Sequence, residues 1–158
     1  MKIGYRVILS AIGCTVLFLF TEGWEADWKR FDSNVYGDNY YDRGSIIRGS
    51  KNIVRVLVKY VPNEKGVMNA VERMGEQFKT LRDSQTLVEL ECAEKKFRIL
   101  SVTLYSKEGG ILYSEKWEEQ ESRWVLVTPQ SGWGSLHGIL CKAKHEDHGL
   151  SGPDVQGR

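Results

Sequence analysis

Runs of alternating apolar and polar residues most constrain the fold of this chain. The clearest run spans 53–61, where Val54, Val56 and Val58 share one side and Arg55 and Lys59 mark the other. Side chains alternate between the two faces of a β-strand, so this run predicts a strand with one buried face. Similar patterns and turn residues between them predict further strands at 28–32, 39–42, 45–48, 86–92, 97–106, 111–117 and 124–127.

Two other segments have helical spacing. Between Val67 and Arg82, apolar residues recur about every four positions and the opposite side is charged. We expect Met68 and Met74 to pack in the core here rather than bind a ligand. The second predicted helix, at about 134–144, places Leu136, Ile139 and Leu140 on or near one stripe.

The order of these elements predicts an α+β fold. Runs of strands, with one helix between them and one at the end, are typical of an antiparallel sheet with helices packed over one face. We expect about five to six strands, one central helix and one C-terminal helix.

The N-terminus has the layout of a secretory signal peptide. Lys2 and Arg6 precede an uncharged apolar run from Val7 to Phe20. This run is shorter than the roughly 20 residues that span a bilayer. We expect residues 1–23 to be the signal peptide, with cleavage after Gly23 or, alternatively, at Ala26. An uncleaved membrane anchor is the other interpretation.

Removal of this signal leaves a chain without net charge. The whole sequence of 158 residues has 22 Lys and Arg against 21 Asp and Glu. The signal peptide contains two basic residues and one acidic residue, Lys2, Arg6 and Glu22. After its removal, basic and acidic residues are equal in number. A neutral chain has no bulk attraction to nucleic acid or to an anionic membrane. We expect one domain at 24–144 and a flexible polar tail at 145–158.

Two cysteines remain in the exported chain, Cys92 and Cys141. An even pair in an oxidising compartment predicts a disulfide, and both positions are expected to face the core. In the loop-entropy model such a bridge is worth about 4 kcal/mol. A redox-active pair is the alternative, although the chain has no Cys-x-x-Cys spacing to favour it.

Several segments, taken in order, carry a family resemblance: Tyr40-Tyr41-Asp42, the strand 54–59, Glu91-Cys92, the strand 96–101, Gly109-Gly110, and 124–129. With the two cysteines, they make the region from Trp28 to Cys141 resemble the surface-adhesin protein E family of exported bacterial proteins. The resemblance implies a small, mainly antiparallel sheet packed with helices and a disulfide between Cys92 and Cys141. It also implies adhesion to host extracellular-matrix and serum proteins. No binding residue carries over from it.

The sequence contains no recognisable motif for catalysis, a cofactor or a metal. It has no nucleophile elbow, P-loop or dinucleotide glycine motif. His145 and His148 lie in the polar tail without further ligands of fixed geometry, so we expect no metal site there. His137 is expected to be a partly exposed surface residue. Glu89 and Glu91 are expected to be solvated on the exposed face of their strand. Glu115, Glu118, Glu119 and Glu121 are expected to lie in an exposed loop.

Aromatic residues near the start of the domain are the best candidates for a binding surface, because aromatic and Arg side chains are favoured at interfaces. The alternative is that the aromatic side chains at positions 24–41 pack in the core. Lys51, Lys95, Lys96 and Arg98 are expected on the same exposed face. The candidate protein-binding surface consists of Trp28, Tyr36, Tyr40, Tyr41, Arg55 and Lys59, with Trp24 nearby.

These expectations describe an exported, non-enzymatic protein of the bacterial envelope or surface that binds a protein partner. It uses no cofactor and no nucleic acid, works in the periplasm or at the outer cell surface, and touches the membrane only through its signal peptide. One alternative is a small periplasmic ligand carrier or enzyme, which a deep pocket with converging polar groups would favour. The other is an envelope structural protein that self-associates through a sheet edge.

Overall fold

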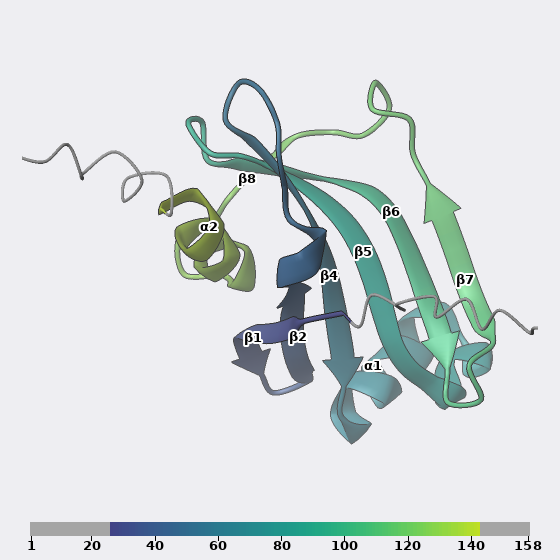
Figure 1. Cartoon of the computed structure of the whole chain (residues 1–158). Coiled ribbons are helices and arrows are strands. Elements are labelled where there is room, and N and C mark those ends of the chain that lie inside the picture. The colour runs from purple at the N-terminus through teal and green to yellow at the C-terminus, as the bar shows by residue number, and fades with distance from the viewer. Residues whose placement is uncertain (1–25, 143–158) are drawn as a thin grey trace, which may run out of the picture.

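A computed structural model describes residues 26–142, and in it eight strands form one antiparallel sheet (Figure 1). The main path of the sheet runs β1-β2-β4-β5-β6-β7, while β3 pairs with β4 and β8 pairs with β6. The strands are β1 (Trp28–Asn34), β2 (Gly37–Asp42), β3 (Ile47–Arg48), β4 (Ile53–Pro62), β5 (Leu81–Glu91), β6 (Lys96–Ser106), β7 (Ile111–Lys116) and β8 (Val125–Leu126). The helices are α1 (Glu64–Met74) and α2 (Gly132–Lys142), with short 3-10 turns at Arg43–Ser45 and Glu76–Thr80.

The predicted α+β class, the antiparallel pairing and the two helices are confirmed. The expected count of five to six strands in the sheet was too low, because the short segments predicted at 45–48 and 124–127 also join the sheet, as the two-residue strands β3 and β8. Within 26–142, no helix is both long enough and apolar enough to cross a membrane. The expected signal peptide, Trp24 and the tail at 145–158 lie outside the described residues.

The core lies on one face of the sheet. Val54, Val56 and Val58 of β4 are buried there, as the alternating pattern predicts. The register places Val56 opposite Val88 and Val54 opposite Leu90, so neighbouring strands add apolar side chains to the same face. This gives the helices one continuous apolar surface on which to pack.

Helix α2 covers this face beside β1 and β2 (Figure 1). Leu136 and Leu140 are fully buried against the β4 valines, and Trp133 stacks on Phe97 with ring centroids 4.4 Å apart. The predicted disulfide joins Cys92, directly after β5, to Cys141 of α2. Ile139 was expected on the apolar stripe but is 41% exposed, because α2 contacts the sheet mainly through Leu136 and Leu140.

Helix α1 covers the same face at the other end of β4 and is shorter than predicted. It ends at Met74, because Gly75 takes a backbone φ of 109° that L-residues rarely adopt. A 3-10 turn then buries Phe78, and β5 starts at Leu81 rather than at 86. The expectation that Met68 and Met74 pack in the core was wrong, since they are 62% and 45% exposed.

Close packing at Gly66 explains why α1 turns these methionines outward. Gly66 and Ala70 are the buried residues of α1. A Cβ atom at Gly66 would lie 2.1 Å from the carbonyl oxygen of Tyr36, in the turn between β1 and β2. That carbonyl also accepts hydrogen bonds from the backbone N–H of Asn63 (2.9 Å) and the hydroxyl of Tyr60 (2.8 Å). The small residues therefore set which side of α1 approaches the sheet.

The two helical glycines Gly66 and Gly138 give a matched test of this packing. Gly66→Ala should lower the free energy of unfolding by about 2 kcal/mol, because the new methyl group overlaps backbone atoms. In Gly138→Ala on α2, the new methyl group meets no atom within 4 Å. This substitution should raise the free energy of unfolding by up to about 1 kcal/mol, because alanine has the higher helix propensity. Urea unfolding followed by circular dichroism measures both. Equal effects of the two substitutions would contradict the close approach at Gly66.

Candidate functional site

The face of the sheet opposite the helices, called the outer face here, carries a row of polar side chains. Because α1 and α2 both pack on the apolar face, neither helix covers this one. Directly paired residues cross six strands in the order Arg30, Tyr40, Lys59, Gln85, Thr103 and Ser114. The hydroxyls of Thr103 and Ser114 lie 3.1 Å apart, which shows that they project on the same side.

Lys59 lies between two aromatic rings of the outer face. Its Nζ lies 4.1 Å from the ring centroid of Trp28 and 6.0 Å from that of Tyr40. An ammonium group at such distances is attracted by the negative face of an aromatic ring. The ion pairs found among the described residues do not include Lys59. Its charge is therefore placed by aromatic contacts, on a half-buried side chain.

The other residues of the predicted surface are not all beside Lys59. Arg55 lies further along β4 on the outer face, while Tyr36 is exposed at the turn between β1 and β2. Tyr41 lies on the opposite face, half-buried against the core and with its ring centroid 6.3 Å from that of Phe31. The structure thus brings together Trp28, Tyr40 and Lys59, and it separates them from Tyr41.

At the other end of the outer face, a buried carboxylate links two arginines. Glu89 is only 4% exposed, so the expectation of a solvated Glu89 was wrong. It accepts hydrogen bonds from Arg55 Nε (2.9 Å) and Arg98 Nε (2.7 Å). Glu119, from the loop after β7, adds an ion pair to Arg55 at 2.9 Å.

Arg98 is correspondingly less accessible than expected. Its side chain is only 12% exposed and pairs with Glu89. The Cζ atom of its guanidinium also lies 4.6 Å from the ring centroid of Trp124. Lys51 and Lys95 are exposed and lie in turns with positive φ, and Lys96 pairs with Glu94. The four glutamates at 115, 118, 119 and 121 are exposed as expected, but Glu115 lies in β7 rather than in the loop. Glu119 pairs with Arg55 and Arg98.

Burial and the arginines act on Glu89 in opposite directions. Burial is the largest single influence and by itself raises the pKa of the Glu89 carboxyl. The hydrogen bonds and positive charges of Arg55 and Arg98 together outweigh it, so the pKa lies below its ordinary value of 4.5. Glu89 is therefore ionised at neutral pH and holds β4, β5 and β6 together. This arrangement serves structure rather than proton transfer.

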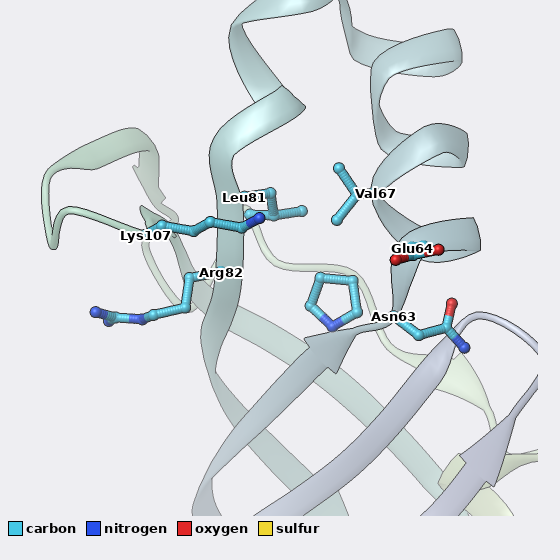
Figure 2. Close-up of a pocket in the computed structure, with 7 residues that line it drawn as sticks. Asn63, Glu64, Val67, Leu81, Arg82 and Lys107 are labelled. Carbon is cyan, nitrogen blue, oxygen red and sulfur yellow. The ribbon is translucent and has the colours of Figure 1, made fainter.

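A cavity at the start of α1 is a candidate site for a small ligand. This cavity, shown in Figure 2, has a volume of about 530 Å³ and lies between the start of α1, the start of β5 and the hairpin after β6. Its walls combine apolar side chains with polar ones: Pro62, Val67 and Leu81, and Asn63, Glu64, Arg82 and Lys107. Figure 2 shows the Arg82 guanidinium directed away from Glu64 on the opposite wall. Arg82 instead pairs with its neighbour Asp83. The cavity is therefore lined by both polar and apolar groups, and the alternative of a ligand carrier or an enzyme stays a prediction.

Sequence reasoning missed the network around Glu89 and the position of His137. The alternating pattern placed Glu89 on the correct face, but only the register shows that Arg55 and Arg98 are its direct neighbours. His137 precedes Cys141 by one helical turn, and its Nε2 lies 3.3 Å from the carbonyl oxygen of Cys92. That spacing is visible in the sequence once the disulfide is expected.

Replacement of Glu89 tests the network. Glu89→Gln should lower the free energy of unfolding by about 3 kcal/mol at pH 7, because two paired arginines lose their buried counter-charge. A carboxyl whose folded-state pKa is depressed stabilises the fold above its unfolded-state pKa. The difference from wild type should thus be complete above about pH 5.5 and shrink as the pH falls through the folded-state pKa, below 4.5.

Glu118→Gln is the control for this measurement. Glu118 is exposed and takes part in none of the ion pairs found within 26–142, so its replacement should change stability by less than about 0.5 kcal/mol. Urea unfolding at a series of pH values gives both curves. A Glu89→Gln effect that stays constant from pH 7 to pH 3 would contradict the ionised, arginine-bound state.

Comparisons with known proteins agree with this architecture. Two crystal structures of Haemophilus influenzae protein E have the same fold. Crystal form II has a TM-score of 0.52 at 19% identity, covering 75% of this chain and 90% of that one. The second has a TM-score of 0.51 at 17% identity, covering 75% and 86%. No curated protein sequence matches significantly. The family model for surface-adhesin protein E matches residues 28–142, so the chain belongs to the surface-adhesin protein E family.

Proposed function

We propose that this chain is an exported, non-enzymatic adhesin-type protein that binds an extracellular or envelope protein through its outer face. The observation that carries the proposal is the uncovered cluster of Trp28, Tyr40 and Lys59. Membership of the surface-adhesin protein E family supports a role at the cell surface. Export through the signal peptide at 1–23 would place the domain in the periplasm or on the outer surface.

The chemistry of the cluster suits a protein partner. Trp28 holds the Lys59 ammonium in place before binding, so little side-chain entropy is lost when a carboxylate of the partner reaches it. Tryptophan and tyrosine are also common among the residues that contribute most to binding energy. Gln85 and Thr103, next in the row, add hydrogen-bonding groups on a rigid sheet. The expected partner segment is acidic and carries an apolar side chain.

Charge reversal at Lys59 tests this proposal. We expect the purified chain to bind a surface coated with serum and extracellular-matrix proteins, and Lys59→Glu to weaken that binding about tenfold or more. Trp28→Ala should weaken it similarly. Lys65→Glu is the matched control, since Lys65 is exposed on α1, away from the outer face, and should bind as wild type does. Circular dichroism should show that all variants stay folded.

Two results would count against the outer face. Wild-type binding no higher than background would remove the proposed function, and equal binding by Lys59→Glu would move the interface elsewhere. Light scattering on the same samples separates adhesion from self-association. The edge strand β7 exposes Ile111 and Tyr113, which could pair with a second copy of the chain. A dimer that persists in Lys59→Glu would favour the alternative in which the protein self-associates.

A further inference from the structure

Three metal-ligating side chains meet where α2 approaches the end of β5. His137 and Cys141 lie one helical turn apart on α2, and Cys92 directly follows β5. One ligand atom from each, the imidazole nitrogen and the two sulfurs, all lie within 4.8 Å of one another. All three residues are half-buried. The fold thus places Cys92 beside a histidine and a cysteine that follow it by 45 and 49 positions in the sequence.

We propose that the chain with its disulfide reduced binds one zinc-type divalent ion through Cys92, His137 and Cys141. Reduction of the bridge by a thiol or phosphine consumes two electrons and two protons and yields two thiols. Each thiol releases its proton as its sulfur binds the metal, and the neutral imidazole nitrogen supplies the third ligand. Two thiolates and one imidazole are a known zinc set, with water in the fourth position.

The required geometry is close to the observed one. Zn–S bonds of about 2.3 Å and Zn–N bonds of about 2.0–2.1 Å put tetrahedral ligand atoms roughly 3.5–3.8 Å apart. After reduction the two sulfurs have to move apart. The imidazole nitrogen, which lies within 4.8 Å of both sulfurs, has to come closer by up to about 1.3 Å, and His137 exchanges its contact with the Cys92 carbonyl oxygen for the metal. Rotation of the cysteine side chains separates the sulfurs, because the Cα atoms of Cys92 and Cys141 are 5.4 Å apart.

Contacts other than the bridge hold α2 in place after reduction. Leu136 and Leu140 are buried in the core, and Trp133 stacks on Phe97. Arg48 also donates a hydrogen bond to the carbonyl oxygen of Leu140 at 3.0 Å. These contacts keep His137 and Cys141 facing Cys92 without the covalent link. The metal and the disulfide are then alternative links between α2 and β5.

Cobalt titration of the reduced full chain tests this proposal. A Cys14→Ser background leaves Cys92 and Cys141 as the two thiols. Under phosphine reductant without oxygen, Co²⁺ should produce thiolate charge-transfer absorption and tetrahedral d–d bands that saturate at one ion per chain, and Zn²⁺ should abolish both. The oxidised protein should show neither. His137→Ala should weaken binding at least about tenfold, since even supporting residues of metal sites cost this much.

The tail histidines provide the matched control. The double variant His145→Ala and His148→Ala should bind cobalt as the parent does. The proposal would be overturned if the tail double variant lost the tetrahedral cobalt bands. It would also be overturned if His137→Ala bound cobalt as tightly as the parent does. If the reduced chain unfolds without metal, Zn²⁺ should refold it, as circular dichroism would show. Absence of the cobalt bands in both folded and unfolded reduced chains would also overturn it.

Discussion

The packing of both helices on the same face of the sheet is the constraint on which the rest of this molecule depends. It follows from the alternation in β4, whose three valines all point to that side, and from the register that aligns Val88 and Leu90 with them. Helix α2 joins this core through Leu136 and Leu140, and α1 extends it at the far end of the strands. Polar side chains are consequently collected on the other face.

The outer face combines a rigid end and an accessible one. Around Glu89, two arginines and Glu119 join three strands and a loop, and these charges largely satisfy one another. On the same sheet, Lys59 contacts Trp28 and Tyr40, and the ion pairs found within 26–142 do not include it. A rigid sheet that presents one preplaced cation beside aromatic rings is suited to recognising a protein surface.

Features governed by local pattern could be predicted from the sequence. The alternation of Val54, Val56 and Val58 predicted the buried face of β4, and the cysteine pair predicted the link between α2 and β5. Features governed by pairing between distant segments could not. The burial of Glu89 depends on Arg98 and Arg55 from two neighbouring strands. The outward turn of Met68 depends on how closely Gly66 approaches the turn at Tyr36.

The central claim is that the outer face, and not the helix-covered side, meets the partner. Hydroxyl-radical footprinting by mass spectrometry tests it most directly, because Trp28, Tyr40 and Met68 all react with the radical. Met68 is exposed on α1 and serves as the internal reference. In the presence of bound extracellular-matrix protein, we expect lower oxidation of Trp28 and Tyr40 with unchanged oxidation of Met68. Protection of Met68 with Trp28 and Tyr40 unchanged would contradict it.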